Sequence, residues 1–139
     1  MRFIDASVFL YAFLKPKRRL PGEIIKLKGS AKRIIERINK GEDVITTVVH
    51  LAEIANILES HTNVMQAINI IEAILSKKNI HVYPVTVTDY IESIEIAKKN
   101  YIGLNDALAV LFMKRLGINE IYSYDSDFDK IANIKKITE

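Results

Sequence analysis

Cysteine is absent from the 139 residues of this sequence, and no apolar stretch approaches the ~20 residues that a membrane-spanning helix requires. The absence of cysteine excludes disulfides, thiolate metal sites and cysteine nucleophiles, and it favours a reducing, cytoplasmic location. Asp5 places a charge where a signal peptide would need an apolar stretch, so we expect no export signal. Linkers, repeats and low-complexity segments are missing as well, and the length fits one domain over residues 1–139.

The charge is modest, but its distribution is informative. There are 20 basic and 17 acidic residues, which gives a net charge of +3. If four of the acids share a pocket, the remaining surface carries 20 basic against 13 acidic side chains. Such a surface attracts a polyanion, while the pocket attracts cations.

Apolar runs of strand length alternate with helical patterns along the chain. We expect strands at residues 2–4, 43–46, 79–83, 120–124 and 134–137. Helices are expected at residues 6–14, 24–39, 48–58, 63–76, 88–100 and 106–116, with a short one from residue 127, and their expected caps are Thr46 or Thr47, Thr62 or Asn63, Thr88 and Asn105. Strands separated by helices pair in parallel, so the predicted fold class is α/β, a three-layer α/β/α sandwich with a central parallel sheet.

Four acidic residues stand out by their surroundings. Asp5 is the only acid among the first 22 residues, and Glu53 and Asp106 each stand alone in similarly long stretches. Each interrupts a run that otherwise looks buried, where an unpaired carboxylate costs on the order of several kcal/mol. Asp125 follows the fourth expected strand directly. A helix cap, a salt bridge or a surface position is the ordinary explanation for any one of them.

The four acids together favour a metal site. We expect them at the carboxyl ends of strands or in the helices that follow, where ligands bind in parallel sheets. A shared dication satisfies several carboxylates at once, and hard oxygen ligands select Mg²⁺ or Mn²⁺ over zinc. Two such ions can activate water and stabilise the leaving oxygen in phosphodiester hydrolysis.

Four short blocks carry a resemblance to a known family. They are Phe-Ile-Asp-Ala-Ser at residues 3–7, Thr-Val-Val-His-Leu-Ala-Glu-Ile at 47–54, Leu-Asn-Asp-Ala-Leu-Ala at 104–109 and Ser-Tyr-Asp-Ser-Asp-Phe at 123–128. In their order and spacing, over the whole chain, they resemble PIN-domain proteins, and especially the VapC toxins of bacterial and archaeal toxin–antitoxin pairs. The resemblance implies a metal-dependent endoribonuclease that hydrolyses RNA as the toxin of such a pair.

The same resemblance implies roles for particular residues. Those that match the family's site are the catalytic metal ligands Asp5, Glu53, Asp106 and Asp125, the orienting hydroxyls Ser7 and Ser123, and Asp127 as either an auxiliary ligand or a helix N-cap. Ser123 departs from the commoner threonine. The implied cofactor is Mg²⁺ or Mn²⁺, and the implied partners are an RNA substrate, a second copy in a homodimer and a small antitoxin.

Several other residues have two readings. The basic group formed by Lys15, Lys17, Arg18 and Arg19 either grips RNA phosphates or only keeps a loop solvated. His50 lies one turn before Glu53, and we expect its ring to face away from the acids. Lys114 and Arg115 suit a helix C-terminus. The isoleucine-rich helix over residues 64–75 is either core or a dimer face.

Three alternatives remain beside the toxin. An RNA-processing PIN nuclease is the first, and the small size without appended domains makes it the less favoured of the two nucleases. The second is a non-catalytic PIN scaffold, against which the four intact acids argue. A receiver-like binding module or a phosphatase with an Asp-x-Asp pair is the third, but the first strand offers Asp5 alone, followed by Ala6 and Ser7.

Overall fold

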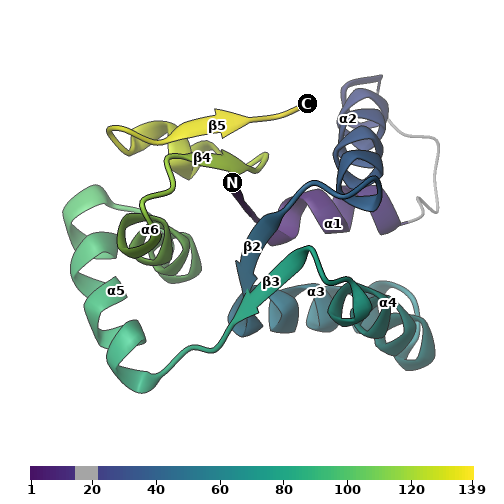
Figure 1. The fold of residues 1–139 in the computed structure, drawn as a ribbon, viewed down its shortest axis with the longest axis horizontal. Coiled ribbons are helices and arrows are strands. Elements are labelled where there is room, and N and C mark those ends of the chain that lie inside the picture. The colour runs from purple at the N-terminus through teal and green to yellow at the C-terminus, as the bar shows by residue number, and fades with distance from the viewer. Residues whose placement is uncertain (15–21) are drawn as a thin grey trace.

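The computed structural model describes residues 1–14 and 22–139 (Figure 1). In chain order the elements are β1 (Arg2–Ile4), α1 (Ala6–Phe13), α2 (Gly22–Asn39), β2 (Val44–Thr47), α3 (Val48–His61), α4 (Val64–Ser76), β3 (Ile80–Tyr83), α5 (Val87–Asn100), α6 (Leu104–Leu116), β4 (Glu120–Tyr122), the 3₁₀ helix η1 (Ser126–Lys130) and β5 (Lys135–Ile137). The basic group at Lys15, Lys17, Arg18 and Arg19 lies outside the described residues.

The five strands form one parallel sheet in the order β3-β2-β1-β4-β5. The chain therefore builds outward from β1 through β2 to β3 and then crosses to β4 and β5 on the other side of β1. The order reverses between β1 and β4, and in such sheets ligands bind outside the carboxyl ends of the strands at this switch point. A receiver-type sheet has the order 2-1-3-4-5, so the topology excludes that alternative.

Side chains alternate between the two faces of the sheet, because successive residues of a strand point to opposite sides. Ile4 and Tyr122 join the apolar cluster that α1, α2, α3 and α4 cover. Phe3, Ile45 and Ile121 join a second cluster with α6 and Phe128. Figure 1 shows α5 and α6 on the side of the sheet opposite α1 to α4. The expected three-layer α/β/α architecture is confirmed.

Helix caps explain most of the boundaries, and two expected caps are wrong. Thr47 accepts a hydrogen bond from the backbone N–H of His50 and begins α3, as one of the two expected candidates. The cap of α5 is Thr86 and not Thr88, because Thr86 forms a reciprocal capping box with Asp89. Helix α6 begins at Leu104 after Gly103, so Asn105 lies inside the helix.

The isoleucine-rich helix α4 is buried on one side only. Ala67 and Ile74 lie in the core, whereas the exposed fractions of Met65 and Leu75 are 63% and 58%. The core reading therefore holds for one face of the helix, and the other face is exposed, so its role as a dimer face stays a prediction. Within residues 1–14 and 22–139, none of the helices combines the length and the apolar character that crossing a membrane demands.

Candidate metal centre

Asp5 begins the site at the carboxyl end of β1. Its side chain is 5% exposed, and its Oδ2 accepts hydrogen bonds from Ser7 Oγ at 2.9 Å and Ser123 Oγ at 2.8 Å. The backbone N–H of Asp5 donates to the carbonyl of Tyr122 at 2.9 Å, which ties the ends of β1 and β4 together. Because both hydroxyls hold the same oxygen, they fix the orientation of the carboxylate.

The two serines also hold the loop after β4. Ser123 is fully buried, and its Oγ accepts from the backbone N–H of Asp125 at 3.0 Å. Ser7 Oγ accepts from the backbone N–H of Tyr124 at 3.1 Å. Each hydroxyl therefore connects Asp5 to the segment that carries Asp125.

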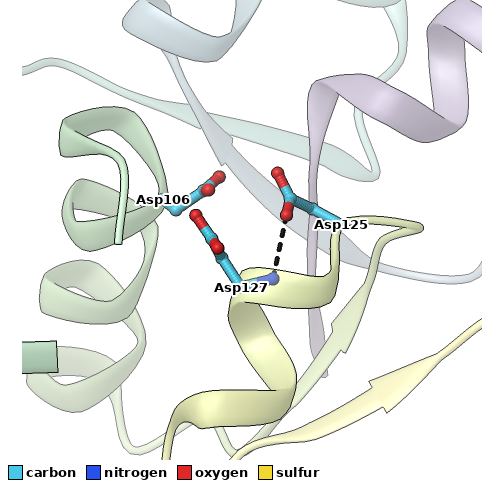
Figure 2. Close-up of side chains that lie close together, drawn as sticks. All are labelled: Asp106, Asp125 and Asp127. Carbon is cyan, nitrogen blue, oxygen red and sulfur yellow. Dashed lines mark hydrogen bonds between the residues drawn. The ribbon is translucent and has the colours of Figure 1, made fainter. Parts of the chain in front are cut away.

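Three carboxylates converge beside this segment. Asp106 on α6 and Asp125 and Asp127 around the start of η1 each offer an oxygen within 4.8 Å of the others (Figure 2). Asp125 Oδ1 accepts from the backbone N–H of Asp127 at 2.9 Å, so the N-cap of η1 is Asp125. The helix-cap reading of Asp127 is therefore wrong: the cap belongs to its neighbour.

Asp127 connects η1 to the start of α6. Its Oδ2 accepts from the backbone N–H of Gly103 at 3.1 Å, and its Oδ1 lies 3.3 Å from Lys130 Nζ. The hydrogen bond from Gly103 is the main cause that lowers the pKa of Asp127, with contributions from Asp106 and Lys130. These contacts therefore favour the ionised form of Asp127.

Asp106 behaves in the opposite way. Burial, a hydrogen bond shared with Asp127 and the charges of Asp5 and Asp125 together raise the pKa of Asp106 to about 9. At neutral pH, without a cation, the cluster therefore retains a proton on Asp106. A bound dication would replace that proton and remove the repulsion that holds it there.

Glu53 faces the same group from α3. Burial is the main cause that raises its pKa, and the charges of Asp5 and Asp125 act in the same direction. A hydrogen bond of 2.6 Å from Asn105 Nδ2 to Glu53 Oε1 opposes this effect. Asp5 and Asp125 therefore lie close enough to act electrostatically on both Glu53 and Asp106, whereas the group of carboxylates within 4.8 Å comprises Asp106, Asp125 and Asp127.

His50 lies in the core next to this site. It is fully buried, its ring meets the Phe3 ring edge-on at 5.1 Å, and its Nδ1 lies 2.7 Å from Thr47 Oγ1. Burial lowers the pKa of His50, and Asp5 partly opposes this. Its ring packs in the core and lies close enough to Asp5 for that carboxylate to act on it, so the expectation that it faces away from the acids stays a prediction.

Two other positions differ from, or add to, the expected site. Arg115 pairs with Asp89 and Glu92 at 2.7 Å each, so its role is to join α6 to α5. Asn105 contacts Glu53 directly, which sequence reasoning missed because an asparagine before a helix resembles a cap. Its position immediately before Asp106 is the one feature of the sequence that could have indicated a role for Asn105 in the site.

Comparison with known proteins agrees with this architecture. The family model for the PIN domain matches residues 2–134. The VapC20 toxin of Mycobacterium tuberculosis, described as cleaving the sarcin–ricin loop, has a similar structure with a TM-score of 0.72, 22% identity and 93% of each chain covered. A search of curated proteins gave no match.

Two further structures are similar over nearly their whole length. A toxin–antitoxin complex from Klebsiella pneumoniae has a TM-score of 0.66 at 12% identity and covers 97% of this chain and 96% of its own. VapBC2 from Rickettsia felis, bound to a DNA fragment from its promoter, has a TM-score of 0.65 at 16% identity, with 98% and 96% covered. At such identities the likeness concerns the fold, whereas the family match extends over almost every residue: the chain belongs to the PIN-domain family.

Proposed function

We propose that this protein is a metal-dependent endoribonuclease in which Asp5, Glu53, Asp106 and Asp125 bind Mg²⁺ or Mn²⁺. The observation that carries the proposal is the convergence of Asp106, Asp125 and Asp127, whose carboxylate oxygens lie within 4.8 Å of one another. Asp5 acts electrostatically on Asp106 and on Glu53, which supports including both Asp5 and Glu53 in the site. The similar VapC20 protein, described as a toxin that cleaves the sarcin–ricin loop, supports the reaction class.

The donors fit a hard dication. They are carboxylates, supported by serine hydroxyls and an amide, and such oxygen donors suit Mg²⁺ or Mn²⁺ better than softer metals. Burial, together with the neighbouring acids, raises the pKa of Asp106, so its charged form is disfavoured there in the absence of a cation. Asp127 has both oxygens engaged, by Gly103 and Lys130, so we assign it an auxiliary role.

The division of labour follows from these contacts. When bound, the ions supply an activated water and stabilise the leaving oxygen of a phosphodiester. Ser7 and Ser123 hold Asp5, and the basic excess on the rest of the surface attracts the RNA backbone. None of these steps requires a cysteine, serine or histidine nucleophile.

The decisive experiment is cleavage of a panel of structured RNAs with Mg²⁺ or Mn²⁺. Asp5→Asn keeps the shape and still accepts from both serines but removes the charge, so it should abolish cleavage. Ser7→Ala should weaken cleavage by about tenfold, because it loosens a ligand without removing it. Asp129→Asn is the matched control, because it makes the same aspartate-to-asparagine change at an exposed residue of η1 that pairs with Lys136. Full activity in a folded Asp5→Asn protein would falsify the proposal.

We further propose that the protein works as the toxin of a toxin–antitoxin pair and as a homodimer. The toxin–antitoxin complex from Klebsiella and the VapBC2 assembly from Rickettsia support an antitoxin partner. The exposed apolar residues Val64, Met65, Ile68 and Leu75 of α4 offer a surface for association. Light scattering at high micromolar concentration should give the mass of a dimer, and a strict monomer there contradicts that part of the proposal.

A further inference from the structure

A chain of hydrogen bonds links three helices beside the acidic cluster. Tyr90 on α5 donates its hydroxyl proton to Asn105 Oδ1 at 2.8 Å. Asn105 on α6 donates from Nδ2 to Glu53 Oε1 on α3 at 2.6 Å. Elements far apart in the sequence thus meet through the side chain of a single asparagine, which directly precedes Asp106.

The amide of Asn105 can serve Glu53 in only one orientation. With Nδ2 toward the carboxylate it donates a charge-assisted hydrogen bond, whereas Oδ1 in that place would repel the negative oxygen. The ionised Glu53 carboxylate, which can only accept, selects the orientation with Nδ2 toward it, and the Tyr90 hydroxyl stabilises that orientation by donating to Oδ1. The N-cap position of α6 belongs to Gly103, which leaves the Asn105 side chain available for this bridge.

Glu53 needs such a partner. A glutamate side chain has several rotatable bonds, and fixing it in one conformation costs conformational entropy. The negative charges of Asp5 and Asp125 disfavour the ionised carboxylate at its position. The amide hydrogen bond opposes both effects, because it holds the side chain in one conformation and donates to the negative oxygen.

We propose that Asn105 is a positioning residue that fixes the Glu53 carboxylate for cation binding, and that Tyr90 acts by fixing the amide of Asn105. This inference rests on the proposed function, since it assigns how one ligand of the proposed centre is oriented. It predicts a hierarchy: Asn105 acts on Glu53 directly, and Tyr90 acts only through Asn105.

The test is calorimetric titration of the protein with Mn²⁺ alone, which needs no RNA and no turnover. Asn105→Ala should weaken Mn²⁺ affinity by about tenfold, and Tyr90→Phe should weaken it by a smaller factor. The double variant should match Asn105→Ala, because the hydroxyl then has nothing to orient. Asn100→Ala is the matched control: its amide donates to the Ile96 carbonyl within α5, and its affinity should equal that of the wild type.

Each result has a distinct meaning. Equal Mn²⁺ affinity in the wild type and in folded Asn105→Ala overturns the positioning role while the proposed function stands. An additional loss from Tyr90→Phe in the Asn105→Ala background overturns the hierarchy, since Tyr90 would then act independently. No Mn²⁺ binding by the wild type overturns the proposed centre itself and this inference with it. Should Asn105→Ala fail to fold, Tyr90→Phe alone decides, because it removes one hydroxyl only, and unchanged affinity there counts against the inference.

Discussion

Asp106 and Asp127 show how two identical side chains acquire opposite properties from their surroundings. Asp127 receives a backbone hydrogen bond from Gly103 and lies beside Lys130, so its pKa falls. Asp106 is more deeply buried and faces the charges of Asp5 and Asp125, so its pKa rises to about 9. A proton shared by the pair therefore resides on Asp106, which is the group most sensitive to metal removal.

This difference predicts a pH dependence of stability in the metal-free protein. Because the folded-state pKa of Asp106 lies above its unfolded value of 3.8, the folded state holds a proton that the unfolded state releases between pH 3.8 and about 9. The contribution of Asp106 to the free energy of unfolding is therefore lost as pH rises through that window. Urea unfolding in EDTA should show a steeper loss of stability from about pH 5 to about pH 8.5 in the wild type than in Asp106→Asn.

Comparing the wild type with Asp106→Asn isolates the effect of Asp106 on stability, because the other titrating groups are present in both proteins. At about pH 8.5 we expect Asp106→Asn to be the more stable of the two in EDTA, because its neutral amide lacks the crowded charge. Equal slopes of stability against pH in the two proteins contradict the raised pKa. The same variant should lose Mn²⁺ binding, so a stabilised but inactive protein is the expected outcome.

At the scale of elements, the sequence predicts what is local and misses what depends on neighbours. Strand and helix positions follow from periodicity, and Thr47 follows from its chemistry as a cap. Thr86 was missed because Thr88 offers the same hydroxyl two residues later, and only the reciprocal bond with Asp89 distinguishes them. The fourth strand ends at Tyr122, two residues earlier than expected, because Ser123 and the residues after it turn toward Asp5.

The candidate site likewise contains residues that the sequence alone could single out and residues that it could not. Asp5, Glu53 and Asp106 could be singled out because a lone acid in an apolar run can be recognised from the sequence alone. The Tyr90–Asn105–Glu53 chain joins three helices, and its members have no mutual signal along the sequence. Strand order could not be predicted either, because alternating strands and helices are compatible with several parallel sheets.

For the whole molecule, the topology explains why the acids meet. Asp5 leaves β1 and Asp125 follows β4, the two strands between which the sheet order reverses. Helices α3 and α6 lie on opposite faces of the sheet (Figure 1). Glu53 of α3 and Asp106 of α6 both feel the charges of Asp5 and Asp125. Each proposed ligand thus comes from a different part of the fold, so metal binding should be linked to the stability of the whole fold.

The last prediction follows from that linkage. A dication that binds the folded state alone stabilises it by about 2.7 kcal/mol at ~100 times its dissociation constant. For a chain of this length the corresponding rise in Tm is on the order of 8–10 °C. Thermal unfolding in Mn²⁺ and in EDTA should differ by that amount for the wild type and for Asp129→Asn, whereas Asp125→Asn should show little difference. Coincident melting curves for the wild type in the two conditions contradict a metal centre that draws its ligands from both faces of the sheet.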